Sequence, residues 1–192
     1  FSLTDGAIRM IVLLHFFHLG FSPLSLALLF LLYELVGVIT NLIGGWVTSF
    51  YGIKRMLSLG VLLQIFGLCL LSFYTSSWGL YSSIIWIMIA QGISGIAKDI
   101  SKTSSKSAVK IVSGDGNGLL FKWVSWFTGL KNISKGLGFF FGSLLIEIIG
   151  FHYSLYTLIL LLSLCLFSLI LLESNLGLLK PSKTLKTFLS KS

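Results

Sequence analysis

Six apolar stretches, each about as long as a helix that crosses a bilayer, follow one another along the 192-residue chain. A helix needs about 20 mostly apolar residues to cross the hydrocarbon core. Short segments with Gly, Ser, Pro or Asn, which favour turns, separate the stretches. Charged residues make up only 10% of the chain, whereas a soluble domain carries about 25%. The sequence therefore predicts an all-α membrane protein with spans at residues 1–18, 23–50, 53–74, 79–100, 119–149 and 153–172.

Lys and Arg residues gather on one side of these predicted spans. The turns around residues 20, 76 and 151 contain none, and 11 of the 14 basic residues lie in the loops and tail of the opposite side. Such loops normally face the cytoplasm, which predicts a multi-pass protein of the cell (inner) membrane with this side inside. The 11 residues are Lys54, Arg55, Lys98, Lys102, Lys106, Lys110, Lys122, Lys180, Lys183, Lys186 and Lys191.

The domain organisation follows from the same pattern. We predict a six-helix transmembrane bundle at residues 1–174, with its first helix truncated, and a basic cytoplasmic tail or central loop at residues 175–192. The net charge of +8 does not indicate nucleic-acid binding, because the lysines lie where topology signals belong. Cys69 and Cys165 fall within apolar spans and form no disulfide framework or zinc motif. No metal-ligand spacing, nucleophile arrangement or phosphate-binding loop is found, so we predict no enzyme, cofactor or metal site.

Charged residues also occur at the middle of three predicted spans. Arg9, Glu34 and the pair Lys131 and Lys135 reach the same depth, and Asp5 lies one helical turn from Arg9. A Lys or Arg at the bilayer centre costs about 2.5–3.5 kcal/mol on insertion scales, so these groups should face a bundle interior or a wet cavity. If they only hold helices together, Asp5 pairs with Arg9 and Glu34 pairs with one lysine. One lysine then remains, and this surplus cation predicts an anionic ligand.

Helical spacing places small and polar residues beside these charges. Stripes spaced by three or four residues fall on one face of a helix. Glycines let another helix or a ligand approach closely, and ordinary helix packing is the alternative explanation. We predict that Arg9, Lys131, Lys135, Asn41 and Gln91 bind substrate. The stripes are Lys131, Lys135, Gly138 and Gly142; Glu34, Gly37, Asn41 and Gly45; and Gln91, Gly95, Lys98 and Lys102.

A basic ridge follows the fourth span. Lys98, Lys102, Lys106 and Lys110 recur every four residues on a helix that continues past the membrane. Two interpretations stay open: a solvated face near anionic headgroups, or a cytoplasmic vestibule that gathers anions. Asp99 neutralises part of the ridge, and we group Asp5, Glu34, Lys98 and Asp99 as charge-pair or coupling candidates.

The segment "GGWVTSFYGIKRM" resembles the loop signature of the major facilitator superfamily, in which Gly, an acidic residue, Gly and a basic pair follow in order. Gly45, Gly52, Lys54 and Arg55 match the signature, and Ser49 stands where the acidic residue is usual. The resemblance implies the N-terminal half of a secondary transporter, built from two inverted repeats of three helices. The C-terminal half would then be a necessary partner.

A closer resemblance covers nearly the whole chain. The segments "LTDGAIRM", "LYELVGVITNLIGGW", "QGISGIAKDISKTSSKSAVK" and "TGLKNISKGLGFFFG" are similar to the organoarsenical efflux permeases of that superfamily. This resemblance implies export of 1-arseno-3-phosphoglycerate, a small organic anion, and a functional link to a glyceraldehyde-3-phosphate dehydrogenase. Two alternatives remain: a permease for another phosphorylated metabolite or drug, and a non-transporting membrane protein whose charges serve assembly.

Overall fold

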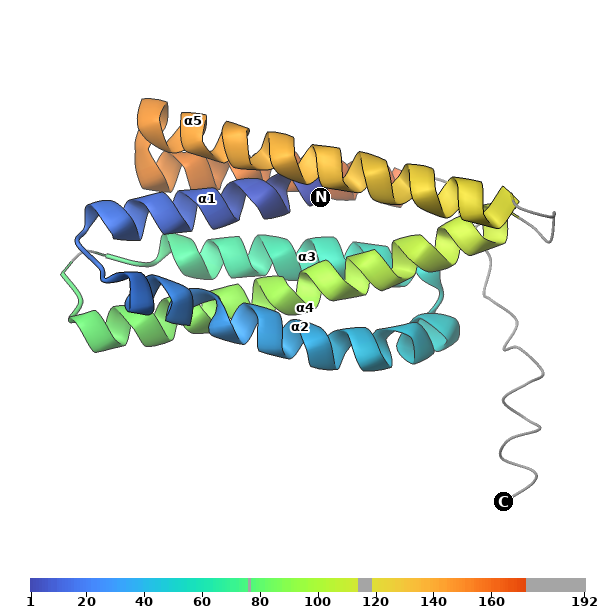
Figure 1. Ribbon diagram of the computed structural model, residues 1–192, viewed down its shortest axis with the longest axis horizontal. Coiled ribbons are helices and arrows are strands. Elements are labelled where there is room, and N and C mark those ends of the chain that lie inside the picture. Colours follow the sequence, from blue (N-terminus) through green and yellow to red (C-terminus); the bar gives the residue numbers. More distant parts are fainter. Residues whose placement is uncertain (76, 114–118, 172–192) are drawn as a thin grey trace, which may run out of the picture.

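The computed structural model describes residues 1–75, 77–113 and 119–171 and shows an all-helical chain (Figure 1). Pro23 stands at the first position of its helix, where its missing N–H is not needed, and the Ser22 hydroxyl caps that helix by accepting from Ser25 N–H at 3.2 Å. Gly52, with φ 82°, separates two consecutive helices. The helices are α1 (Ser2–His18), α2 (Pro23–Tyr51), α3 (Ile53–Ser72), α4 (Leu80–Ser113) and α5 (Leu119–Leu171).

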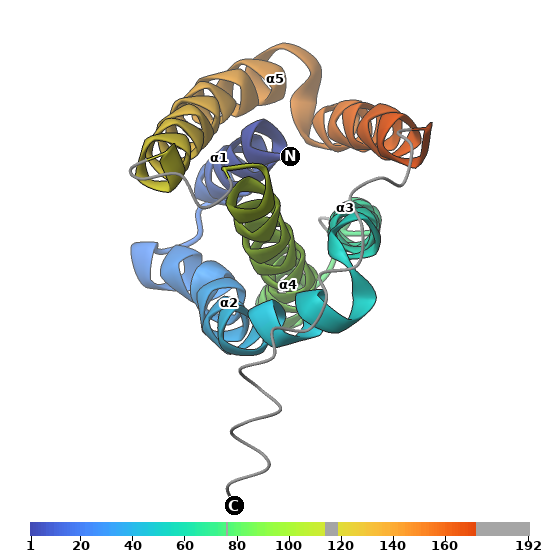
Figure 2. The same cartoon turned by 90° about the vertical axis from the view of Figure 1, so that its right-hand side faces the viewer.

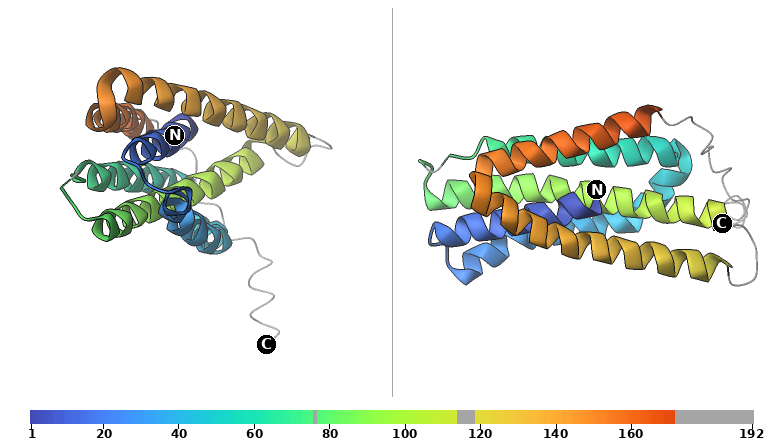
Figure 3. Two further views of the ribbon diagram at one scale, coloured as in Figure 1. Left: turned by 60° about the vertical axis from the view of Figure 1, so that its left-hand side comes forward. Right: turned by 90° about the horizontal axis from the view of Figure 1, so that it is seen from above.

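Helix α5 consists of two helical stretches joined at Gly150. The backbone there has φ 77° and ψ 179°, a conformation that is not helical and that strongly favours glycine. The two stretches fold back on one another as a hairpin (Figure 3). The bend falls in the break that the sequence predicts between residues 149 and 153.

Four helices are long and apolar enough to cross a membrane, judged over the described residues: Pro23–Thr48, Ile53–Ser72, Leu80–Lys110 and Leu120–Leu171. Helix α1 has only 17 residues, and the two stretches of α5 are counted as one. Large apolar side chains also cover the outside of the bundle, among them Leu42, Phe140 and Phe167. A surface of this kind is stable in lipid rather than in water, so the chain is a multi-pass membrane protein.

The helix connections lie at two opposite ends of the bundle (Figure 1), and these ends differ in charge. One end holds the α1–α2 turn, the α3–α4 loop and the Gly150 bend. The other end holds the α2–α3 junction, the end of α4 and the start of α5, and we call it the basic end. It carries Lys54 and Arg55 in the first turn of α3, Lys110 in the last turn of α4 and Lys122 in the first turn of α5.

Helix packing is mainly pairwise: α2 packs on α4, α1 packs on α5, and α3 packs on both α4 and α5. Helix α4 therefore runs through the middle of the arrangement (Figure 2). The apolar core includes Ile8, Phe16 and Leu155, and it is concentrated away from the basic end. Aromatic contacts close that opposite end, where the His15 ring stacks on Phe151 at a centroid distance of 3.9 Å.

Glycines bring α1 against the first stretch of α5. A Cβ added at Gly138 would overlap the carbonyl oxygen of Leu3, and one added at Gly142 would overlap that of Ala7. The glycine stripe that continues from Lys131 and Lys135 thus serves helix packing, as the small-residue alternative predicted. The contact also fixes how the two lysines are turned toward α1.

We expect Gly138→Leu to destabilise the bundle strongly. The added side chain would meet backbone rather than a movable side chain, so the effect should exceed the roughly 1–3 kcal/mol that is usual for overpacking. The measurement is the melting temperature of the purified chain in detergent. Gly136→Leu is the matched control, because it makes the same change on the same helix where nothing lies within 4 Å. Equal melting temperatures for the two variants would contradict the close packing of α1 on α5.

Candidate functional site

A cavity of about 260 Å³ lies among α1, α3, α4 and both stretches of α5. Lys98 and Lys102 reach it from α4, and Lys131 and Lys135 reach it from α5. Of the described residues that line it, Asp5 alone is acidic. The cavity therefore has a strongly cationic wall, and we call it the lysine cavity.

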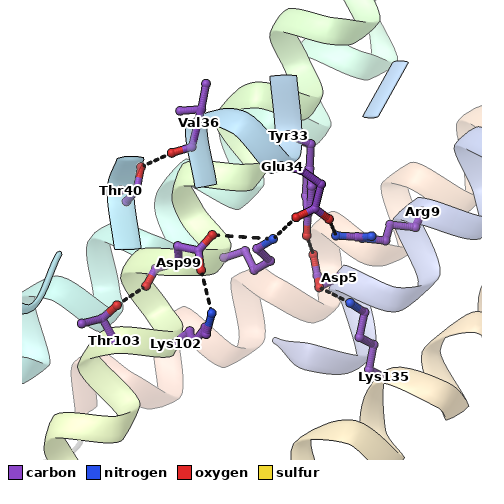
Figure 4. Close-up of polar contacts among 11 residues, drawn as sticks. Asp5, Arg9, Tyr33, Glu34, Val36, Thr40, Asp99, Lys102, Thr103 and Lys135 are labelled. Atoms are coloured by element: carbon purple, nitrogen blue, oxygen red, sulfur yellow. Dashed lines mark hydrogen bonds and ion pairs between the residues drawn. The ribbon is translucent and has the colours of Figure 1, made fainter. Parts of the chain in front are cut away.

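Asp5 is almost fully buried on α1. It accepts a hydrogen bond from the Tyr33 hydroxyl, and its Oδ2 lies 4.0 Å from Lys135 Nζ (Figure 4). The ion pairs of the described residues do not include the Asp5–Arg9 pair that we predicted within one helix. Asp5 is held toward α2 and α5 by Tyr33 and Lys135, whereas the longer Arg9 side chain reaches across to α2.

Glu34 joins α1 and α4 from its position on α2. Its Oε1 accepts from Arg9 Nη2 at 2.6 Å, and its Oε2 accepts from Lys98 Nζ at 3.3 Å. The expected lysine partner from the fifth span is therefore replaced by Lys98. Lys98 begins the basic ridge and is also one of the predicted charge-pair residues; its side chain is only 17% exposed and reaches Glu34 of α2.

Tyr33 is the central residue that the sequence analysis missed. Its ring lies between the Arg9 guanidinium, 4.1 Å from the ring centroid, and the Lys98 ammonium, 4.2 Å from it. Both cations face the ring's electron-rich π surface, which is a favourable arrangement in a desolvated site. The sequence could have indicated this residue, because it is a Tyr in the middle of a predicted span, whereas tyrosines in membrane helices usually lie at the interfaces.

Asp99 offsets the positive charge of the first two lysines of the basic ridge. It is buried, and its carboxylate oxygens lie 3.6 Å from Lys98 Nζ and 3.2 Å from Lys102 Nζ (Figure 4). Lys106 and Lys110 are exposed. The four ridge lysines therefore divide, because the first two face the bundle interior and the last two face outward.

The charges around the lysine cavity do not cancel. The cations are Arg9, Lys98, Lys102, Lys131 and Lys135, and the carboxylates are Asp5, Glu34 and Asp99. Each cation except Lys131 has a carboxylate within 4.0 Å among the described residues. Five cations against three carboxylates leave an excess positive charge inside the membrane-spanning part of the chain. Such an arrangement attracts an anion.

Three predicted substrate contacts, Arg9, Asn41 and Gln91, do not line this cavity. Asn41 is exposed on α2, and Gln91 is fully buried on α4 but does not line the cavity. Both amide atoms of Gln91 lack a hydrogen-bond partner among the described residues. The structure thus brings together Lys131 and Lys135 in the lysine cavity, whereas Arg9 pairs with Glu34 beside it.

The predicted loop-motif residues lie at the α2–α3 junction. Gly45 faces Thr103 of α4, where an added Cβ would be 3.8 Å from its methyl group, and Gly52 provides the positive φ of the turn. Lys54 Nζ donates to the Ile170 carbonyl at 3.2 Å, which ties the start of α3 to the end of α5. Arg55 is exposed. These residues position the basic end and do not line the lysine cavity.

The described residues contain no group of His, Cys, Asp or Glu that could hold a metal ion. The site is suited to noncovalent binding of an anion by lysine ammonium groups, which form charge-assisted hydrogen bonds with phosphate-like oxygens.

Comparison with known proteins identifies the family. The profile of the Major Facilitator Superfamily matches residues 1–190, which is nearly the whole chain. A search of curated proteins finds no match. The matched range contains the α2–α3 junction and all the charges around the lysine cavity. The chain therefore belongs to the major facilitator superfamily, whose members are secondary transporters.

Proposed function

We propose that this chain forms the N-terminal bundle of a transporter that exports a small organic anion, with 1-arseno-3-phosphoglycerate as the cargo. The observation that carries the proposal is the excess of cations around the lysine cavity, and above all Lys131, which has no carboxylate partner among the described residues. A cargo with a phosphate and an arsenate group would supply the missing negative charge at two positions.

The size of the cavity supports a small cargo. Its volume of about 260 Å³ is below the roughly 300–1,000 Å³ that is typical of pockets for drug-sized ligands. Lys131 and Lys135 are one helical turn apart on α5, and Lys98 and Lys102 are one turn apart on α4. Two pairs of cations on two helices could each hold one anionic end of a short molecule.

We further propose six crossings arranged as two inverted repeats, with α1 and each stretch of α5 crossing separately. In such repeats, α1 corresponds to α4, and α2 corresponds to the first stretch of α5. The contact between α1 and α5 then corresponds to the contact between α4 and α2, and both contacts are extensive. Both are also made at glycines: Gly138 lies against the Leu3 backbone, and Gly95 lies against the Tyr33 backbone. The basic end would face the cytoplasm of the inner membrane.

The transport mechanism would require a second bundle as partner. In alternating access, one bundle rocks against the other around a site near the middle of the bilayer. Asp5 is the better candidate for the coupling carboxylate, because it is buried, lines the lysine cavity and faces Lys135, whereas the Glu34 side chain is 58% exposed. Protonation of Asp5 would release Lys135 for the cargo.

A purely structural role for the charges is the competing proposal. Ion pairs between helices explain Arg9, Glu34 and Lys98, and ion pairs within α4 explain Asp99. Both kinds of pair leave Lys131 unexplained. Another phosphorylated metabolite remains a candidate cargo, because the same cations would bind it.

The test uses cells that express the complete transporter together with the glyceraldehyde-3-phosphate dehydrogenase. We expect growth on arsenate and lower cell-associated arsenic, because the organoarsenical is exported as it forms. The control is a strain without that dehydrogenase, in which the transporter should give no resistance. In inside-out vesicles, competition by other phosphorylated metabolites ranks the cargoes. Equal resistance with and without the dehydrogenase would contradict the proposed cargo.

A further inference from the structure

A second, apolar groove lies between the end of α4 and the start of α5. These two helix ends lie at the basic end of the bundle (Figure 1). Its volume is about 320 Å³. We call it the Trp groove, and its lining residues are Ala108, Val109, Trp123, Trp126, Phe127 and Leu130. Phe127 also lines the lysine cavity, so it belongs to the wall between the two sites.

Helical spacing explains the apolar lining of the groove. Trp123, Trp126, Phe127 and Leu130 follow one another at intervals of three, one and three residues, which places them on a single face of α5. Trp123 and Trp126 are more than half exposed although both line the groove. Tryptophans are enriched at the level of lipid headgroups. The groove therefore lies where hydrocarbon and headgroups meet.

Two exposed lysines lie next to residues that line this groove. The exposed Lys106 lies one turn before Val109, and the exposed Lys122 adjoins Trp123 and lies one turn before Trp126. The helical segments 103–109 and 119–130 contain Lys106 and Lys122 and no Asp or Glu. An anion would therefore be attracted to the rim of the groove.

The combination of apolar groove and basic rim fits one class of membrane component. An acyl chain gains little free energy by moving from the lipid tails into an apolar groove, because the two environments are equally apolar. The groove therefore fixes the position of the acyl chain, and the charge of the headgroup decides which lipid is retained. Basic pockets between membrane helices bind anionic headgroups in this way.

We propose that the Trp groove binds one acyl chain of an anionic phospholipid, with its phosphate headgroup on Lys106 and Lys122. This site is distinct from the lysine cavity and does not depend on the identity of the cargo. The bound lipid would cover the joint between α4 and α5 and support Phe127 from the side opposite to the lysine cavity.

The test is native mass spectrometry of the full chain in mild detergent, with phosphatidylglycerol and phosphatidylcholine of identical acyl chains as probes. The wild-type chain should retain one phosphatidylglycerol in preference to phosphatidylcholine. In the double variant Lys106→Gln/Lys122→Gln, the preference for phosphatidylglycerol should fall by roughly 10- to 30-fold. Both lysines are removed, and each contributes about equally to the attraction of the anionic headgroup. Ala108→Phe, which fills the groove, should lower retention of both lipids.

The matched control is the double variant Lys54→Gln/Arg55→Gln, which removes the same charge from the same end of the bundle, at the start of α3. It should keep the wild-type preference. An equal loss of preference in both double variants would show general attraction to a charged surface and would overturn the site. Retention of one tightly held phosphatidylglycerol by Ala108→Phe would also overturn it.

Discussion

Lys131→Ala in the complete transporter is expected to lower the affinity for the anionic cargo by roughly 10- to 150-fold without lowering the membrane yield. The change removes a charge-assisted hydrogen bond, which contributes about 1.5–3 kcal/mol. Lys131 lines the lysine cavity and has no carboxylate within ion-pair distance among the described residues, so folding loses no partner. Lys131→Arg should restore part of the affinity, because it keeps the charge and changes the geometry. The measurement is the cargo concentration for half-maximal transport in inside-out vesicles.

Lys135→Ala provides a comparison on the same helix face. It should also weaken cargo binding, but it additionally leaves the buried Asp5 without its cation, so the membrane yield should fall. The tail variant with glutamines at all four lysines is the charge control and should keep most of the transport, since those positions lie in the predicted water-facing tail: Lys180, Lys183, Lys186 and Lys191. Full arsenate resistance of both alanine variants at normal yield would show that these lysines do not bind the anion.

A large effect on stability is also expected from Asp99→Asn. This change keeps the shape of the side chain but removes the negative charge that lies between Lys98 and Lys102. Breaking a buried ion pair at one partner destabilises a protein by about 3–5 kcal/mol, because the other charge stays buried. We expect about 3 kcal/mol here, since both lysines are partly exposed and Lys98 keeps Glu34. The measurement is the melting temperature and the folded yield in detergent.

Two further variants make this result specific. Glu147→Gln removes a carboxylate from an exposed position on α5 and should leave the melting temperature nearly unchanged. Adding Lys102→Gln to Asp99→Asn should recover part of the lost stability, because it removes the lysine left without Asp99. Independent effects of the two substitutions would contradict the ion pair.

The sequence predicted the positions of the turns well. Gly52 and Gly150 adopt a positive φ where a helical stretch ends, and both glycines lie in breaks that the sequence predicts between spans. The membrane character followed from the low share of charged residues, and the family profile supports the resemblance carried by the α2–α3 junction. Turn residues, composition and a loop motif are properties of the sequence and of its local backbone. They can therefore be recognised without knowing which residues are neighbours in the tertiary structure.

Helical periodicity also placed Lys131 and Lys135 on one face and at one depth, and both line the same cavity. It also placed Lys98 and Lys102 on one face, and it left open whether that face is solvated or lines a vestibule. The rotation of α4 about its own axis turns these two lysines inward, with Lys98 on Glu34 of α2 and both lysines lining the lysine cavity. This rotation is set by Gly95 against the Tyr33 backbone, a contact between residues that are far apart in the sequence.

The partners of the charges were decided only by the tertiary structure. Spacing made Asp5 and Arg9 neighbours on α1, yet Arg9 pairs with Glu34, and Asp5 accepts from Tyr33. The sequence by itself indicated that charge lies within the apolar helices and that cations exceed carboxylates. Which cation meets which carboxylate depends on the packing of α1 against α5 and of α2 against α4. The electrostatic energy of a pair depends on its separation and surroundings, and both are fixed only when the helices pack.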